Sequence, residues 1–178
     1  MIYQSLDASN QNEIARLIKT SFTRSDGENE GALVGNLASK LALSIDNDET
    51  ICLGACENSA LVGVIFFTRL RFNTPVSVYM LAPVAVSIDK QGEGIGQALI
   101  RHGLAEIRKR SVKIAVTYGD PSFYSKVGFE PLSEGLIKAP LKLSMPFGWL
   151  GQSLTDETIP SIDEQPGCVA AFNDPAYW

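Results

Sequence analysis

Three glycines that alternate with other residues limit the possible folds of this chain more than any other sequence feature. They lie in Gln91-Gly92-Glu93-Gly94-Ile95-Gly96, directly after an apolar, strand-like run and directly before a helical pattern. At such a junction, unpaired backbone N–H groups and the positive end of the helix dipole face the same space. That arrangement holds phosphate groups in many proteins. The order of strand, glycine loop and helix therefore predicts a pyrophosphate-binding loop in a protein that mixes strands and helices.

Two familiar glycine-rich loops do not match this segment. A dinucleotide-binding loop needs G-x-G-x-x-G, but Gln97 and Leu99 occupy the positions that a third glycine would need. A Walker loop needs Gly-Lys-Ser or Gly-Lys-Thr, and neither occurs in the chain. A flexible turn before a surface helix remains the structural alternative.

The surrounding sequence predicts an α/β fold. Apolar residues at helical spacing predict helices over Asn12–Phe22, around Leu33, Leu37 and Leu41, and over Gly92–Arg110. Strands are expected at Thr50–Cys56, Leu61–Arg71, Val76–Val86 and Val112–Thr117, the last laid parallel to its predecessor by a helical crossover. Asp120-Pro121 and Gly128 bound a short helix, and further strands are expected near 138–145 and 168–172.

Composition indicates one ordinary globular domain over residues 1–178, because 45% of the residues are hydrophobic and 20% are charged. No apolar stretch approaches the roughly 20 residues of a membrane span, and no leader-like segment follows Met1, so we expect a cytoplasmic protein without a membrane partner. The three cysteines lack a C-x-x-C pair and predict reduced thiols. The single histidine, His102, has no neighbouring ligand, so no metal is expected.

The charge of the chain bears on two classes of partner, nucleic acids and cationic ligands. The net charge of −5 argues against nucleic-acid binding, which needs a basic surface. Residues 143–178 contain five acidic residues and no basic one. Such a segment could attract a cationic ligand, or it could keep an exposed tail soluble, and the sequence leaves both explanations open.

The glycine loop, taken with two neighbouring segments, resembles the Gcn5-related N-acetyltransferase (GNAT) superfamily and its YhbS-like branch. Gln91–Gly96 is similar to the family's Q/R-x-x-G-x-G/A loop and follows Leu81–Ser87, where the family has its cofactor-binding strand. Gly119–Phe129 resembles the family's Y-x-x-x-G-F segment. The resemblance implies a mixed, mostly antiparallel central sheet with helices on both faces. It also implies direct transfer of an acetyl group from acetyl-CoA to a primary amine in a ternary complex.

The resemblance assigns the cofactor site to residues around Pro83. A proline inside a strand cannot donate to the ladder, so the cofactor-binding strand should splay there. In the family, the backbone of Val84, Ala85 and Val86 then pairs with the pantetheine arm, and a backbone N–H there stabilises the oxyanion. The pyrophosphate is expected on the loop and the first turn of the helix, that is, on Gln91, Gly92, Glu93, Gly94, Ile95, Gly96 and Gln97.

Tyr124 is the candidate catalytic residue. The family places a tyrosine here, and a phenol with a pKa near 10 suits protonation of a thiolate leaving group. The alternative is a core aromatic residue. The general base is not assigned, although Glu28 and Glu30, in the expected turn between the first two helices, border the acceptor cleft in the family. Trp149 is expected either to line the acceptor pocket or to pack in the core.

The acceptor itself stays open between small-molecule and peptide amines, with a homodimer as one possible assembly. A non-catalytic acyl-CoA-binding sensor or scaffold is the alternative function, because no base can be named.

Overall fold

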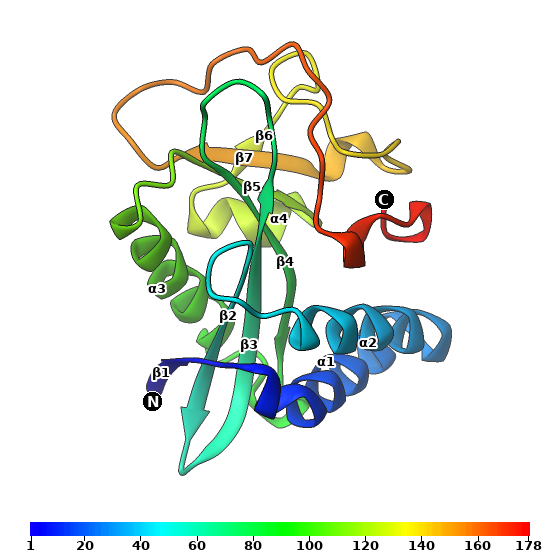
Figure 1. Cartoon of the computed structure of the whole chain (residues 1–178). Coiled ribbons are helices and arrows are strands. Elements are labelled where there is room, and N and C mark those ends of the chain that lie inside the picture. The colour runs from blue at the N-terminus through cyan, green and yellow to red at the C-terminus, as the bar shows by residue number, and fades with distance from the viewer. The chain divides into compact units, whose positions relative to one another are not determined.

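The computed structural model describes residues 1–178 as a mixed α/β fold with seven strands in one sheet, ordered β1-β2-β3-β4-β5-β7-β6 (Figure 1). The strands are β1 Ile2–Ser5, β2 Thr50–Glu57, β3 Ala60–Leu70, β4 Val78–Val86, β5 Ile114–Tyr118, β6 Glu130–Pro131 and β7 Trp149–Ser153. The helices are α1 Gln11–Asp26, α2 Glu28–Leu43, α3 Ile95–Lys109 and α4 Pro121–Tyr124. The fold class predicted from the sequence is confirmed.

The chain divides into two compact units. The first unit comprises Met1–Phe67 and Pro83–Gly103, and the second comprises Thr68–Ala82 and Leu104–Trp178. Strands β3 and β4 and helix α3 therefore contribute residues to both units. The expectation of a single domain stays a prediction.

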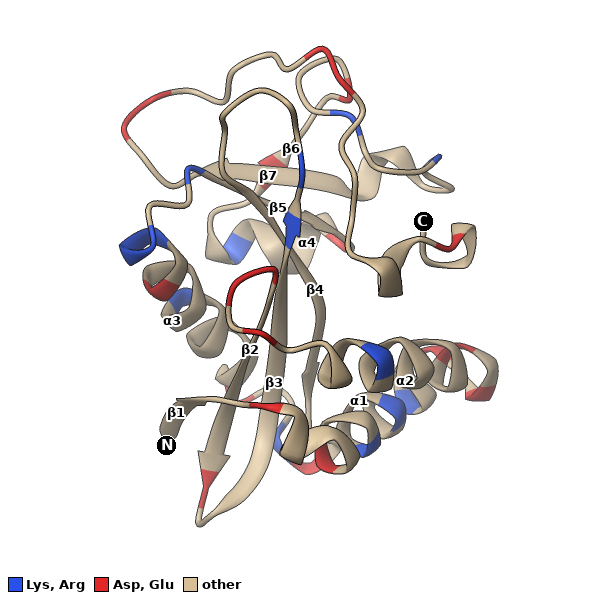
Figure 2. Ribbon diagram, in the orientation of Figure 1, with Lys and Arg blue, Asp and Glu red and all other residues tan.

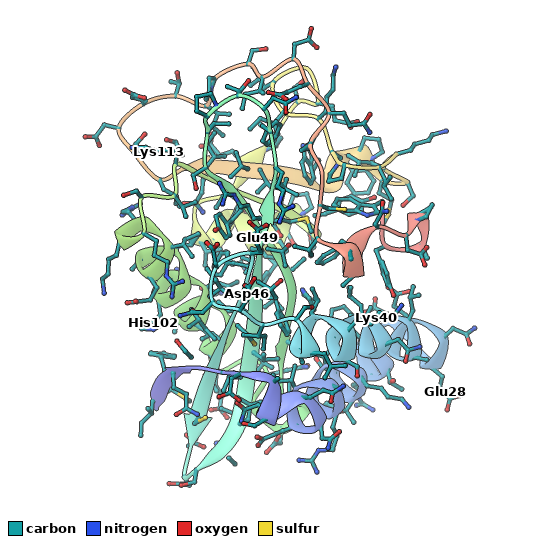
Figure 3. The ribbon with its side chains drawn as sticks, viewed as in Figure 1. Glu28, Lys40, Asp46, Glu49, His102 and Lys113 are labelled. Atoms are coloured by element: carbon teal, nitrogen blue, oxygen red, sulfur yellow. The ribbon has the colours of Figure 1, made fainter.

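In the first unit, α1 and α2 form a helical hairpin on the opposite side of the strands from α3 (Figure 1). Gly27 alone separates α1 from α2, with a φ of 95° that an L side chain rarely adopts. Glu28 and Glu30 lie in the first turn of α2, so their placement in a turn between the helices was wrong. Acidic side chains are favoured at that position by the helix dipole. Glu28 is the first residue of α2, and its side chain points away from the strands of its unit (Figure 3).

Helix α3 packs closely on β3 because glycines remove side chains where the two elements meet. A Cβ on Gly63 of β3 would lie 3.3 Å from Leu99 and 3.4 Å from Ile95. A Cβ on Gly103 of α3 would lie 2.7 Å from both Ile65 and Phe67. This packing fixes the axis of α3 and, with it, the direction in which the first turn of the helix presents its amides.

In the second unit, β5 is paired on both sides. The first half of β4 runs parallel to β5, from Val78 opposite Ile114 to Leu81 opposite Thr117, which confirms the predicted crossover. On its other side, β5 pairs antiparallel with β7. The side chain of Asp120 accepts the amide of Ser122 and begins α4, as its N-cap position predicts.

The carboxyl-terminal third differs from the sequence prediction. Residues 138–145 form an irregular segment with bends, and residues 170–172 form a 3-10 helix, so the strands expected in these regions are wrong. Pro140 and Pro146 interrupt the first segment and deprive a ladder of donors. The strand of this region is β7, and its Trp149 is 1% exposed, with its indole N–H donating to the carbonyl of Ile137 over 3.0 Å. Trp149 is therefore a core residue rather than a pocket residue.

Most of the acids after Lys142 have structural partners within the second unit. Glu164 accepts the backbone amides of Asn73 and Thr74 over 2.8 and 2.7 Å, respectively. Asp163 accepts from Lys138 over 2.9 Å, and Asp174 begins the last 3-10 helix by accepting an amide. Three of the five acids therefore have partners within the second unit.

We expect the Glu164 contact to make stability pH-dependent. Hydrogen bonds from the Thr74 side chain and from the Thr74 and Asn73 amides hold the pKa of Glu164 below its ordinary value of 4.5. The stabilisation is therefore fully present above pH 4.5 and is lost as the pH falls through the lowered pKa. The melting temperature should therefore fall more steeply between pH 7 and pH 3 for the wild type than for Glu164→Gln. Asp163→Asn, which removes only an exposed ion pair, serves as control, and parallel curves for wild type and Glu164→Gln would contradict this account.

Candidate functional site

The glycine loop is open and conformationally specialised. Gly92 and Gly94 have φ angles of 84° and 80°, which favour glycine, and a Cβ at either position would meet nothing within 4 Å. Residues 91–94 are exposed. The loop therefore exposes its backbone to a ligand without side chains in the way.

The first turn of α3 supplies free backbone donors. The first helical hydrogen bond joins the Ala98 amide to the Gly94 carbonyl over 3.0 Å, so the amides of residues 95–97 precede the intrahelical ladder. Ile95 is 7% exposed and packs toward Gly63, which leaves only its backbone for a ligand. Together with the helix dipole, these amides form a site suited to an anion.

Gln91 anchors the loop. Its side-chain amide donates to the carbonyl of Val86 over 3.0 Å and to the hydroxyl of Ser21 on α1 over 3.3 Å. The side chain therefore ties the loop to the end of β4 and to α1. The side-chain nitrogen of Gln91 is therefore engaged within the protein.

Residues Val84 to Val86 belong to the last part of β4. Ala85 is buried, while Val84 and Val86 are half-buried on the other face of the strand. The pairing of β4 with β5 runs from Val78 to Leu81, and Pro83 follows two residues later. The carbonyl of Val86 already accepts from Gln91, so this group is less free than the sequence suggested.

Lys90 reduces the negative charge beside the loop. Its ammonium lies 2.5 Å from a carboxylate oxygen of Glu57 and 4.0 Å from one of Glu93. Because Glu93 is half-exposed and shares this cation, its charge is partly offset where an anionic ligand would bind.

Tyr124 occupies the second unit and is held on three sides. A hydrogen bond joins its side chain to Thr117, whose hydroxyl donates to the carbonyl of Leu81 over 2.7 Å. Its ring makes edge contacts with Phe123 and Phe129, at centroid distances of 5.0 and 5.8 Å. Burial raises the pKa of Tyr124 to about 12; the Thr117 hydrogen bond opposes this effect and the charge of Asp120 adds to it. Tyr124 is therefore a protonated phenol at neutral pH.

A cavity of about 320 Å³ lies beside Tyr124 within the second unit. Its lining includes Tyr118, Gly119, Met145 and Phe147, of which Phe147 is 68% exposed. A Cβ on Gly119 would lie 2.6 Å from the ring of Tyr124, so the ring packs directly against the cavity wall. The sequence did not predict this cavity: Met145 was expected at the end of a strand, and Trp149 was the residue of this segment considered for the acceptor pocket.

The site combines a strand, a glycine loop and a helix amino terminus on a mixed sheet, an arrangement suited to a phosphate-bearing ligand. Residues 3–132 match the family model described as the acetyltransferase (GNAT) domain. The chain therefore belongs to the GNAT acetyltransferase family, as the sequence resemblance predicted.

Curated relatives and solved structures agree with this assignment. The chain is 35% identical over 101 residues to the uncharacterised N-acetyltransferase YjhQ of Escherichia coli, a match that covers 53% of this chain and 55% of that protein. The match thus spans about half the length of the relative. E. coli YhbS, solved in complex with CoA, superposes with a TM-score of 0.78 at 21% identity, over 97% of this chain and 92% of that one.

A second solved structure has the same fold. A GNAT family acetyltransferase from Brucella melitensis, in complex with acetyl-CoA, has a TM-score of 0.68 at 24% identity, over 97% of both chains. None of the helices of this chain has the length and apolar character that a bilayer span requires.

Proposed function

We propose that this protein transfers the acetyl group of acetyl-CoA to a primary amine. The observation that carries the proposal is the open loop at Gly92 and Gly94 leading into the free amides of α3, in a chain of the GNAT family. The relatives solved with CoA and acetyl-CoA support the same cofactor.

The loop and helix residues would hold the cofactor's pyrophosphate through their backbone amides. The positive φ of Gly92 and Gly94 and the open space around both fit a phosphate group at close range. The backbone of Val84 and Ala85 is the proposed partner of the pantetheine arm, and a backbone N–H there is the proposed oxyanion donor.

In the proposed reaction, the neutral amine attacks the thioester carbonyl, and a carbon–nitrogen bond replaces the carbon–sulfur bond. Tyr124 donates its phenolic proton to the departing sulfur, and the ammonium that forms loses its proton to solvent or to an unassigned base. The raised pKa of Tyr124 keeps that proton in place at neutral pH. The cavity beside Tyr124 is the proposed binding site for an apolar part of the acceptor.

The test is release of free thiol from acetyl-CoA, measured with a panel of cationic, neutral and aromatic amines. Each positive acceptor should gain the mass of one acetyl group, and thiol release should require the acceptor. Tight acetyl-CoA binding without thiol release or a mass gain across the panel would contradict catalysis and leave a cofactor-binding sensor as the better account.

A further inference from the structure

One face of α1 carries a group of basic residues that the proposed reaction does not use. Positions 16, 19, 20, 23 and 24 share one side of the helix, because they repeat at intervals of three and four residues. Together with one residue beyond β4, they line a cavity of about 590 Å³ in the first unit, here called the α1 groove: Arg16, Lys19, Thr20, Thr23, Arg24 and Ile88. Figure 2 shows the basic residues spaced along α1. This volume lies in the range of small-ligand sites.

The cations of the α1 groove have no protein partner. Arg16, Lys19 and Arg24 are exposed, and none of them forms an ion pair in the structure. No acidic side chain lines the groove, although the chain as a whole has a net charge of −5. Like charges on neighbouring turns of a helix repel each other, so an anion bound between them would be stabilised.

A second cavity adjoins the α1 groove. This cavity of about 350 Å³ shares Arg16, Thr20 and Ile88 with the α1 groove and is also lined by Ser87. The Ser87 hydroxyl oxygen is buried and has no hydrogen-bond partner.

Charge orients a ligand across the two cavities. Glu13 and Asp89 line the cavity that contains Ser87, so an anion fits at the Lys19 and Arg24 end instead.

We propose that the α1 groove binds a phosphate monoester, with Arg16, Lys19 and Arg24 as its charge partners. Two sources carry this group: the 3′-phosphate of coenzyme A, or a phosphate on the acceptor. The first rests on the proposed function, and Ile88 of the groove stands three residues before Gln91 of the glycine loop. Guanidinium and ammonium groups form charge-assisted hydrogen bonds to phosphate in either case.

The test compares CoA with dephospho-CoA by calorimetric titration in the wild type and in Lys19→Gln/Arg24→Gln. Glutamine keeps the stem of Lys19, which packs near Gly35 of α2. Lys40→Gln is the control, because Lys40 is an exposed cation of α2 outside the α1 groove (Figure 3). If the groove holds the coenzyme's phosphate, the wild type and the control should bind CoA roughly 3- to 30-fold more tightly than dephospho-CoA. The double variant should bind the two coenzymes equally.

If the groove holds a phosphate of the acceptor instead, CoA and dephospho-CoA should bind with equal affinity to the wild type, the control and the double variant. Inorganic phosphate, titrated at saturating CoA, should then bind to the wild type and the control but not to the double variant. If the double variant changes neither the coenzyme preference nor phosphate binding, the α1 groove is not a phosphate site. Absence of CoA binding in the wild type would instead refute the proposed function, and the phosphate titration would still test the groove.

Discussion

Gly94→Glu is expected to abolish measurable binding of acetyl-CoA, a loss of at least roughly 100-fold or about 2.8 kcal/mol. The substitution places a carboxylate beside the amides that begin α3, where the pyrophosphate is proposed to bind. A Cβ at Gly94 would meet nothing within 4 Å, so the main expected cost to folding is the strain of a positive φ, of order 1–3 kcal/mol. Calorimetry on the folded variant measures the loss.

Gly27→Glu is the matched control for this substitution. Gly27 also precedes a helix of the first unit, has a φ of 95°, and has nothing within 4 Å of a Cβ. It therefore reproduces the positive φ, the added charge and the helix-end position away from the glycine loop. Normal binding by Gly27→Glu together with lost binding by Gly94→Glu would locate the effect at the loop. Equal affinity of the wild type and folded Gly94→Glu would remove the cofactor site from Gly94.

Tyr124→Phe is expected to lower kcat by roughly 10²- to 10⁴-fold while leaving the affinity for acetyl-CoA nearly unchanged. The ring and its contacts with Phe123 and Phe129 remain, whereas the proton donor and its hydrogen bond to Thr117 are removed. Steady-state thiol release with a confirmed acceptor measures the change. Tyr3→Phe is the control, because it removes a phenol that stacks on His102 in the first unit. Wild-type turnover in Tyr124→Phe would make Tyr124 a packing residue.

The pH profile gives a second readout of Tyr124. Because burial raises its pKa to about 12, the phenol stays protonated through the range in which amine acceptors lose their protons. We therefore expect kcat to rise with pH as the acceptor deprotonates and to show no decline from Tyr124 before about pH 11. An alkaline decline near pH 10 that disappears in Tyr124→Phe would contradict the raised pKa.

Segments with local signals were predicted well from the sequence. Asp120, Pro121 and Gly128 enclose α4 and the turn after it through contacts that span only a few residues, so their pattern was sufficient. The parallel pairing of β4 with β5 followed from chain order and crossover geometry. The glycine loop was found because its conformation depends on residues within the loop itself.

Features that depend on distant partners were not predicted. Trp149 lies in the core because its indole N–H donates to the carbonyl of Ile137 and because its strand, β7, pairs with β5. Strand β1 has only four residues, and none of them is fully buried, so no alternation marks it. The acids of the carboxyl-terminal segment looked uncompensated, because the partners of Glu164 lie about 90 residues earlier in the chain. The cations of the α1 groove gave no sequence signal beyond helical spacing.

Amide NMR spectra recorded with and without CoA test the central claim most directly, since they report the proposed donors one by one. The account predicts the largest shifts and the strongest protection from hydrogen exchange at the amides of Gly92 and Gly94 and of residues 95–97. Amides of Gly27 and the start of α2 should not change, although that helix begins in the same way. Perturbation elsewhere in the chain with unchanged signals from the glycine loop would contradict the proposed cofactor site.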